Sequence, residues 1–498
     1  MPSHLLAIDE GTTRATVVVV DDGGRIVASE GRELHQYYPR PGWVEQDPHE
    51  IWQAVRDLSR AAIAAARLAP ADIAAVGITN QRETTVLWER ATGNPVYPAI
   101  VWQDRRGADL CKRLEADAAG TFIASRTGLV LDPYFSATKI AWLLDNDASL
   151  RRRSERGEIC FGTVDSWLIW NLTCGAAHVT EATNASRTLL MDLGSLAFDD
   201  DLLEMFGVER PMLPDIRSSG SVLGEVSPDV FGTNNVPIAG VLGDQQSALF
   251  AQGCHRPGQA KNTYGTGSFV LCNTGTEPVV DRGPLLATVA VGGDGSANYA
   301  LEGSIFATGA AVQWLRDGLG LIYDATETEA LAASLDGNDD VWFVPALAGL
   351  GAPYWDPDAR GTLLGVTRAT TRAHLVRAVL ESIAWRTRDV LDAMAAVGRP
   401  VTEMRVDGGA AANSWLMQFQ SDVTGIPVDV AAMTETTSLG AAYLAGLTVG
   451  IWKDYDDIDR LRESGRRFEP SWSPAQRDDL HARWKEAVER SRRWARPT

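Results

Sequence analysis

Two stretches of the chain share one pattern of apolar and polar positions. Residues 5–20, LLAIDEGTTRATVVVV, consist of an apolar run, a Gly-Thr turn and a β-branched run, and residues 260–272, AKNTYGTGSFVLC, repeat that shape. Such runs joined by a short glycine-containing turn are typical of β-hairpins. Because the two units lie about 255 positions apart, the sequence predicts two similar domains, which we expect at residues 1–252 and 253–498.

The rest of the apolar pattern predicts strands and helices in alternation. Short apolar runs of the kind found in buried strands occur at residues 74–79, 236–242 and 341–345. Residues 372–395 carry apolar positions three or four apart, which predicts a long helix with Thr371 as its N-cap. Another helix is predicted from Ser473 and Pro474, with an apolar face that would dock on the C-terminal domain, formed by Leu480, Trp484 and Val488. Mixed elements of this kind indicate an α/β fold.

Charge narrows the class of ligand. The 498-residue chain has 46 Lys and Arg against 65 Asp and Glu, a formal net charge of −19, so its surface would repel nucleic acid and anionic membranes. Five of the basic residues are lysines: Lys112, Lys139, Lys261, Lys453 and Lys485. A phosphate site must therefore depend mainly on arginine, backbone N–H groups or a metal ion.

The cysteines and the N-terminal segment bear on the compartment. Five scattered cysteines without C-x-x-C spacing argue against a disulfide framework and against a zinc site, and we expect reduced, buried thiols at Cys111, Cys160, Cys174, Cys254 and Cys272. The first apolar run stops at Asp9 without a preceding basic segment, and no run of about 18 apolar residues occurs later. We therefore expect a cytoplasmic protein without membrane insertion.

Three turns rich in glycine are candidates for binding phosphate. The motif G-x-x-x-x-G-K-S/T is absent, and no G-x-G-x-x-G opens a helix after a strand. Phosphate can instead be held by turns whose backbone N–H groups converge, and such turns occur at residues 9–13, DEGTT, at 264–268, YGTGS, and at 407–413, DGGAAAN. Asp9 could also hold Mg²⁺ through water. One such turn is typical of an ordinary hairpin, whereas three in this order favour a phosphate site.

Polar residues suited to a hydroxylated substrate follow two of the predicted strands. Arg82 and Glu83 come directly after the strand at 74–79, although adjacent opposite charges are also typical of a surface ion pair. Trp102 offers an aromatic platform or belongs to the core. Asp244 follows the strand at 236–242, where a carboxylate is suited to act as a general base or to cap a helix.

These residues match the motifs of a known family. The chain resembles the FGGY carbohydrate kinases, and among them the glycerol kinases, over essentially its whole length. The matching segments include PGWVEQDPHEIW (41–52), GITNQRETTVLWE (77–89), AIVWQDRR (99–106), FGTVDSWLIW (161–170), TNASRTLLMD (183–192), GDQQSALF (243–250), KNTYGTGSF (261–269), GLGAPYWDPDARG (349–361) and MRVDGG (404–409). The two general signatures of the family also match, at residues 134–142 and 361–381.

The resemblance implies two actin-like (ribonuclease H-like) domains with an active-site cleft between them, and ATP-dependent phosphorylation of glycerol to sn-glycerol 3-phosphate with Asp244 as the base. The residues that it implies for glycerol are Arg82, Glu83, Trp102, Tyr134, Asp244, Gln245 and Phe269. ATP would contact Thr12, Thr13, Thr266, Gly309, Gln313, Gly409 and Asn413, with Asp9 positioning Mg²⁺. We also expect a homodimer or homotetramer.

The first turn departs from the family pattern D-Q-G-T-T-S-S-R. Glu10 stands where the family has glutamine, and its carboxylate could either tighten Mg²⁺ binding or repel the γ-phosphate. The family's phosphate-contacting arginine falls on Thr16, while Arg14 stands two places earlier. Because residues two apart on a strand share a face, our hypothesis is that Arg14 takes over this contact.

Residues 225–240 lack the Gly-rich basic loop with which many bacterial relatives bind fructose 1,6-bisphosphate, so inhibition by that sugar phosphate is not expected.

Two other interpretations stay open at this point. One is a kinase for another small polyol or ketose, such as erythritol, dihydroxyacetone or a pentulose. The implied glycerol-contact residues argue against it, and the altered first turn keeps it open. The other is an actin-like binding or sensory protein without turnover, and the presence of both Asp9 and Asp244 argues against that.

Overall fold

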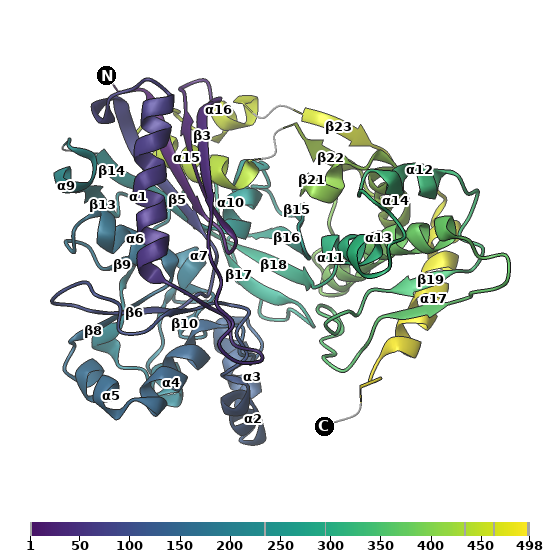
Figure 1. Ribbon diagram of the computed structural model, residues 1–498, viewed down its shortest axis with the longest axis horizontal. Helices are drawn as coiled ribbons and strands as arrows, with labels where there is room; N and C mark the ends of the chain where they lie inside the picture. Colours follow the sequence, from purple (N-terminus) through teal and green to yellow (C-terminus); the bar gives the residue numbers. More distant parts are fainter. Residues whose placement is uncertain (1, 234–235, 294, 433–434, 462–463, 496–498) are drawn as a thin grey trace.

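The fold is built on two large mixed sheets, one from each half of the chain (Figure 1). It is described here from a computed structural model, for residues 2–233, 236–293, 295–432, 435–461 and 464–495. The first sheet has the strand order β13-β14-β5-β1-β2-β3. Its strands are β1 (His4–Glu10), β2 (Arg14–Val20), β3 (Ile26–Glu33), β5 (Ile73–Asn80), β13 (Gly224–Val226) and β14 (Val236–Gly243).

The second sheet has the order β17-β18-β16-β15-β21-β22-β23. Its strands are β15 (Gln259–Tyr264), β16 (Ser268–Gly275), β17 (Leu286–Val291), β18 (Ala297–Ile305), β21 (Glu403–Gly408), β22 (Val428–Ala431) and β23 (Ser464–Phe468).

Both sheets contain the same five-strand arrangement. In the first, β3, β2 and β1 are antiparallel, and β5 and β14 continue parallel to β1. In the second, β18, β16 and β15 are antiparallel, and β21 and β22 continue parallel to β15. The predicted pair of hairpins is therefore confirmed at β1–β2 and β15–β16. The α/β class is confirmed too, with the sheet arrangement of the actin-like (ribonuclease H-like) fold.

Helices cover both faces of the first sheet. Successive strand residues point to opposite faces, so Leu6 and Ile8 of β1 pack with α1 (Pro48–Ala65) and α6 (Val164–Leu172), whereas Leu5 and Ala7 pack with α10 (Asp244–Ala251) and α15 (Thr436–Thr448). Helix α15 comes from the far end of the chain, and Figure 1 shows it lying against the first sheet. The C-terminal half thus contributes to the packing of the N-terminal sheet.

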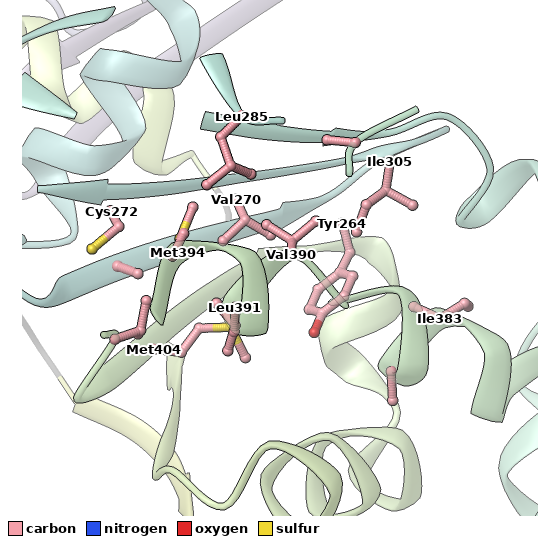
Figure 2. Close-up of a cluster of buried hydrophobic side chains, with 14 of the residues drawn as sticks. Tyr264, Val270, Cys272, Leu285, Ile305, Ile383, Val390, Leu391, Met394 and Met404 are labelled. Atoms are coloured by element: carbon pink, nitrogen blue, oxygen red, sulfur yellow. The ribbon is translucent and has the colours of Figure 1, made fainter. Parts of the chain in front are cut away.

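The second sheet packs on α13 (Arg372–Ala396), α14 (Ser414–Thr424) and α17 (Pro474–Ser491). Figure 2 shows this core, in which Val390 and Met394 of α13 face Val270 of β16 and Met404 of β21. The predicted helix at 372–395 is confirmed almost to the residue. The predicted docking face of the last helix is confirmed as well, with Trp484 and Val488 fully buried in this core.

A smaller, largely helical region is formed by part of the sequence that runs from β6 (Val86–Glu89) to β14. Its helices are α2 (Ala108–Ala116), α3 (Ala119–Thr127), α4 (Ser136–Asn146), α5 (Ala148–Glu155) and α8 (Asp200–Phe206), beside β8 (Ile159–Gly162). Their core includes Phe135 and Ile140 and extends to Leu286 of β17, so this region bridges the first sheet to the second.

The remaining elements are short. They are β4 (Glu45–Gln46), β7 (Ala99–Ile100), β9 (Val179–Glu181), α7 (Ala182–Ala185), β10 (Met191–Asp192), β11 (Ala197–Phe198), β12 (Asp215–Arg217), α9 (Pro228–Phe231), α11 (Gly309–Gln313), α12 (Glu327–Ala333), β19 (Trp342–Val344), β20 (Thr362–Leu364), α16 (Tyr455–Leu461) and the turns η1 (Pro70–Asp72), η2 (Arg210–Met212), η3 (Trp314–Gly318) and η4 (Gly409–Ala412). The strand predicted at 341–345 is β19.

Two expectations about the whole chain can be compared with the structure. All five cysteines are free thiols and four are buried, but the prediction of a buried thiol is wrong for Cys174, which is exposed just after α6. No helix among the described residues is long and apolar enough to cross a bilayer. The segment 225–240 that lacks a basic loop forms β13, α9 and β14, with residues 234–235 outside the described range.

Candidate active site

Three of the predicted site loops, those at Gly11, Arg82 and Asp244, follow the carboxyl ends of parallel strands. In the first sheet, Glu10 at the end of β1 pairs with Asn80 at the end of β5, and Asn80 pairs with Gly243 at the end of β14. The three strands therefore end together, and the turn at Gly11, the loop at Arg82 and Asp244 lie along one edge. Such an edge is where α/β folds place their ligands.

The matching edge of the second sheet faces this one. Tyr264 at the end of β15 pairs with Gly408 at the end of β21, which brings the second and third glycine turns together. The start of α15 contacts both edges, because the Ser438 hydroxyl lies 3.3 Å from Asp9 and the Thr436 hydroxyl donates to Asp407. The three turns singled out in the sequence thus gather in one place.

Asp244 begins α10 and lies beside Arg82. The Arg82 Nε atom is 3.2 Å from Asp244 Oδ1, and the same oxygen accepts a 2.7 Å bond from the backbone N–H of Gln245. Gly243 holds the N-cap position, so the alternative interpretation of Asp244 as the helix cap does not hold. About a quarter of the Asp244 side chain is exposed (28%), in contrast to Arg82, which is buried. The carboxylate is therefore accessible to a small substrate.

Arg82 and Glu83 do not form a surface ion pair. Both are buried, and each pairs with a distant residue. Arg82 binds Glu302 of β18 through two hydrogen bonds of 2.7 and 3.2 Å, and Arg187 donates to Glu83 at 2.6 Å. Arg187 also reaches Glu302 at 3.1 Å, so the four side chains form one connected network.

Burial and the two neighbouring arginines shift the pKa values of the two glutamates in this network. Burial opposes ionisation of Glu302, but Arg187 and Arg82 outweigh it and lower the pKa of Glu302 to about 2. Burial raises the pKa of Glu83 despite its two arginine neighbours. Glu83 also has a positive φ of 63°, which is uncommon for a residue with a side chain and is found where function demands it.

Trp102 and Tyr134 form an aromatic corner beside the residues expected to bind the substrate, which are called the acceptor residues below. Their rings meet edge to face with centroids 5.4 Å apart, and the Trp102 indole N–H donates to the Thr12 hydroxyl at 2.9 Å. Trp102 is partly exposed, which favours the prediction of an aromatic platform over that of a core residue. Tyr134 precedes α4, and burial raises the pKa of its phenol.

The second sheet supplies the opposite wall. Phe269 of β16 pairs with Thr263 of β15 and Ser304 of β18, and directly paired residues share a face. Lys261 lies on that face two residues before Thr263 and donates to the Gln245 side chain, while Glu302 lies two residues before Ser304. Phe269 and Gln245 are therefore brought close to Arg82 and Asp244.

Most of the residues expected to contact ATP lie in the second half, and they are Thr266, Gly309, Gln313, Gly409 and Asn413. The backbone N–H of Gly309 donates to Gly265 at 3.0 Å and that of Ala310 donates to Thr266, so α11 starts directly on the β15–β16 turn. A β-carbon at Gly309 would stand 2.7 Å from the Gly265 carbonyl, and only glycine permits this approach. Gln313 ends α11 and is exposed.

The third turn supplies the other two predicted contacts. Gly409 starts η4 and would have open space around a β-carbon. Asn413 caps α14, because its side-chain oxygen accepts from the N–H of Leu416 at 2.9 Å, while its amide donates to Thr328 at 3.2 Å. These two residues thus lie on the edge that also carries Thr266.

Arg14 lies on the face predicted for it. Asp9 pairs with Thr16 and Thr16 pairs with Gly31, so all three share a face with Arg14, which is two residues from Thr16. The Arg14 guanidinium occupies the space where a β-carbon of Gly31 would stand. It lies at the rim of the same edge as the exposed Thr13 and the partly buried Thr12.

Asp9 is the candidate metal ligand. Burial, Asp244 and Glu435 raise its pKa to about 7, against a weak opposing contact from Ser438. A cation would favour the ionised form of such a carboxylate. No cluster of three or more His, Cys, Asp or Glu residues suited to a metal occurs within the described ranges. A Mg²⁺ ion at Asp9 would therefore take most of its ligands from phosphate and water, as Mg²⁺ commonly does.

The side chains of Glu10 and Asp9 lie on opposite faces of β1. Neighbouring strand residues point to opposite faces, and Glu10 is buried where its two oxygens accept from the Gln81 amide at 3.1 and 3.3 Å. The Gln81 oxygen accepts from Thr84, whose oxygen accepts from the N–H of Trp102. These contacts give Glu10 a role in supporting the loop that carries Arg82, and its two alternative effects, tighter Mg²⁺ binding and repulsion of phosphate, stay predictions. Burial raises the pKa of Glu10 to about 8.

Three buried charged residues of the site were missed from the sequence: Arg187, Glu302 and Lys261. Glu302 is the one charged residue in the strand ANYALEGSI, and a lone charge in an otherwise apolar strand is a detectable signal, since buried charges are rare unless paired. Arg187 lies in the matching segment at 183–192, but nothing local distinguishes it.

Comparison with known proteins agrees with this architecture. Residues 4–251 match the N-terminal domain of the FGGY family of carbohydrate kinases, and residues 260–449 match its C-terminal domain. Glycerol kinase 2 of Thermotoga maritima is 54% identical over 492 residues, covering 99% of each chain. The glycerol kinase of Caldanaerobacter subterraneus is 50% identical over 496 residues, covering 99% of this chain and 100% of the other.

Solved structures give the same result. The crystal structure of Plasmodium falciparum glycerol kinase with ADP superposes with a TM-score of 0.92 at 38% identity, covering 98% of each chain. A ligand-bound xylulose kinase from Lactobacillus acidophilus superposes with a TM-score of 0.88 at 20% identity, covering 98% of this chain and 97% of the other. The second likeness is one of fold alone.

Proposed function

The chain belongs to the FGGY family of carbohydrate kinases, and we propose that it transfers the γ-phosphoryl group of ATP to glycerol, forming sn-glycerol 3-phosphate and ADP. Full-length relatives at 50 to 54% identity carry the name glycerol kinase. The observation that carries the proposal is the placement of Asp244 and Arg82 in contact, at an edge that faces the glycine turns of the second sheet.

The acceptor half is suited to a short polyol. Arg82 donates and Glu83 accepts hydrogen bonds, so together they can bind vicinal hydroxyl groups. Trp102 and Phe269 offer apolar surfaces to the carbon chain from opposite sides. A site whose polar groups expect hydroxyl partners rejects analogues that lack them, because those groups would be left unpaired.

Asp244 would take the proton of the attacking hydroxyl. As the glycerol oxygen forms its bond to the γ-phosphorus, the bond from phosphorus to the β,γ-bridging oxygen breaks and ADP leaves with that electron pair. The hydroxyl proton passes to the Asp244 carboxylate, which Arg82 holds in position at 3.2 Å. Phosphoryl transfer depends chiefly on such alignment and on charge neutralisation.

The nucleotide half would hold ATP through the backbone and hydroxyl groups of the Thr12, Thr266 and Gly409 turns, with Gln313 and Asn413 further along the second edge. Arg14 would add a positive charge near the phosphates. Mg²⁺, when bound at Asp9, supplies neutralisation of phosphate charge. This arrangement accounts for phosphate binding by a chain with few lysines.

A coupled ADP-release assay on the purified full chain tests the proposal. Glycerol, erythritol, dihydroxyacetone, xylulose and gluconate are compared as acceptors at saturating MgATP, and the product from glycerol is identified with a stereospecific glycerol 3-phosphate dehydrogenase. We expect the highest kcat/KM on glycerol. Preference for a longer acceptor would exclude glycerol as the substrate, and absence of turnover on all five would exclude the kinase activity.

A further inference from the structure

We propose that Glu302, which comes from the second sheet, is a positioning residue of the acceptor site: it holds Arg82 and Arg187 in the orientation in which Arg82 and Glu83 bind the acceptor hydroxyls. The inference rests on the proposed function and adds a residue to its acceptor site. Both sheets then contribute residues to that site, since Arg82 follows β5 of the first sheet and Glu302 lies in β18 of the second.

Glu302 is shared between two guanidinium groups. Its Oε2 accepts from Arg82 Nη1 at 2.7 Å, and its Oε1 accepts from Arg82 Nη2 at 3.2 Å and from Arg187 Nη2 at 3.1 Å. The Ser304 hydroxyl donates to Oε1 at 3.2 Å as well. With four donors on two oxygens and no exposed surface, this carboxylate fixes the planes of both guanidinium groups.

Each arginine passes that orientation to a residue facing the acceptor. Arg82 reaches Asp244 through the Nε atom that its pairing with Glu302 leaves free. Arg187 holds Glu83 at 2.6 Å through its own Nε. The chain of contacts thus runs from one carboxylate through two arginines to Glu83 and Asp244, the two acidic groups expected at the hydroxyls.

One donor in this network has no hydrogen-bond partner in the part of the chain that the structure describes. The Nη1 atom of Arg187 is buried and makes no hydrogen bond within the described ranges. Arg187 lies 5.6 Å from the ring of Tyr134, which belongs to the aromatic corner of the acceptor site. A buried unpaired N–H is rare in folded proteins and often marks a place for water or ligand. The Arg187 guanidinium also lies 5.3 Å from the ring of the buried Phe135, so Arg187 lies between the aromatic corner and the core of the helical region.

The second sheet is tied to Arg82 by a further contact. The Gln246 oxygen accepts from Arg82 at 3.3 Å, while the Gln246 amide donates to Thr288 and Val289 of β17 at 3.1 Å each. Acceptor recognition therefore depends on β17 and β18 lying against the loop after β5. Removing the charge of Glu302 would leave two buried arginines without their shared partner, a large penalty in a buried network.

The test is a steady-state comparison of Glu302→Gln with a matched buried carboxylate elsewhere. Asp389→Asn is the control, because Asp389 is equally buried in the same half and bridges Arg386 at 3.1 Å and His481 at 2.9 Å between α13 and α17. We expect Glu302→Gln to raise the KM for glycerol at least about tenfold with the KM for ATP within about twofold of wild type. Asp389→Asn should lower Tm and leave both KM values unchanged.

Glu302→Asp covers the case in which Glu302→Gln does not fold. It keeps the charge but is one methylene too short to reach both arginines, so a smaller rise in the glycerol KM is expected. An unchanged glycerol KM in the folded variants, or an equal rise in Asp389→Asn, would overturn the inference. Lack of glycerol phosphorylation by the wild-type protein would instead overturn the proposed function, so the two failures can be told apart.

Discussion

The turn after β1 and the turn after β15 join matching hairpins but differ in charge, because the first carries Asp9, Glu10 and Arg14, whereas the second, YGTGS, carries no charged residue. The first is closed by a 3.0 Å bond from Gly11 to Arg14, and the second by a 2.8 Å bond from Gly265 to Gly267. At matching positions the first sheet has Asp9 on β1 paired with Thr79 on β5. The second has Thr263 on β15 paired with Asp407 on β21. At this pair of positions each sheet thus carries one carboxylate, Asp9 in the first and Asp407 in the second, but on different strands.

The two carboxylates also differ in what surrounds them. The Oδ2 atom of Asp407 accepts hydrogen bonds from Gln252 at 3.1 Å and from the Thr436 hydroxyl, both of them groups of the fold itself. Asp9 has a long contact of 3.3 Å with Ser438 and two acidic neighbours, Asp244 and Glu435. A repeated scaffold therefore provides one edge suited to a cation and to chemistry, and another suited to holding a ligand through its backbone.

The largest predicted effect is a loss of kcat at the first edge, in contrast to weaker ATP binding at the second. We expect Asp244→Asn at the first edge to lower kcat about 100- to 10,000-fold, because the amide cannot accept the hydroxyl proton. Thr266→Ala at the second edge should raise the KM for ATP with little change in kcat. Steady-state kinetics with ATP varied at saturating glycerol gives both the kcat and the KM for ATP of each variant. Equal kcat losses in the two variants would remove the division of roles.

Asp9 and Asp407 provide the second comparison, through both activity and stability. Asp9→Asn should lower kcat about 100- to 1,000-fold in MgATP assays, because charge stabilisation near the phosphates is lost. Asp407→Asn should instead lower Tm, because the carboxylate that accepts from Gln252 and Thr436 is replaced. Thermal unfolding of both variants without ligands, alongside the kinetics, tests this.

The pH dependence of stability tests the burial of Asp9 directly. The pKa of Asp9 is raised from 3.8 to about 7 in the fold, so its protonated form is favoured there. Its contribution to stability is fully present below about pH 4 and is lost as the pH rises through about 7. Because an asparagine side chain cannot ionise, Asp9→Asn should raise the Tm of the ligand-free protein above pH 7, relative to wild type. A lower Tm in that range would contradict the burial argument.

Local features were predictable from the sequence, and long-range pairings were not. The hairpins at β1–β2 and β15–β16, the helix at Arg372–Ala396 and the apolar face around Trp484 follow from patterns within a few turns of chain. The packing of α15 on the first sheet joins segments more than 400 positions apart, such as Ser438 and Asp9. No local pattern encodes such a contact.

The site divides in the same way. Motif resemblance identified Arg82 and Glu83, but their adjacency suggested a surface pair, because their partners Glu302 and Arg187 lie over 100 positions away. The direction of Glu10 needed the strand bounds of β1, which the sequence alone did not fix to the residue. Cys174 looked buried by residue type, yet it follows the end of α6 and is exposed.

A smaller effect is expected at the altered residues of the first turn. Arg14→Ala should raise the KM for ATP about three- to tenfold, as expected for loss of one partly exposed charge-assisted contact, with the glycerol KM unchanged. Gly31→Ala should act in the same direction, because a β-carbon there displaces the guanidinium. Arg25→Ala is the control, since Arg25 is an exposed arginine of the same sheet region paired with Asp21. Normal ATP kinetics in Arg14→Ala would show that Arg14 does not replace the family's arginine.

The smallest expected effect compares two glycines of the second edge. A β-carbon at Gly309 would stand 2.7 Å from the Gly265 carbonyl, whereas one at Gly409 would have no protein atom within 4 Å. Gly309→Ala should therefore lower stability by about 1–3 kcal/mol, since α11 must shift away from the turn, and raise the KM for ATP about two- to fivefold. Gly409→Ala should keep the wild-type Tm, because the added β-carbon meets no other part of the fold.

Thermal unfolding with and without MgATP distinguishes these two causes. In Gly309→Ala the loss of Tm should appear in the ligand-free protein, because the conflict is between α11 and the β15–β16 turn. In Gly409→Ala the ligand-free Tm should match wild type, and the added stabilisation by MgATP should be smaller, since a ligand stabilises only as far as it binds the folded state. If instead both variants showed full stabilisation by MgATP, neither turn would contact the nucleotide. The proposed difference between the two edges, chemistry at the first and nucleotide binding at the second, would then be wrong.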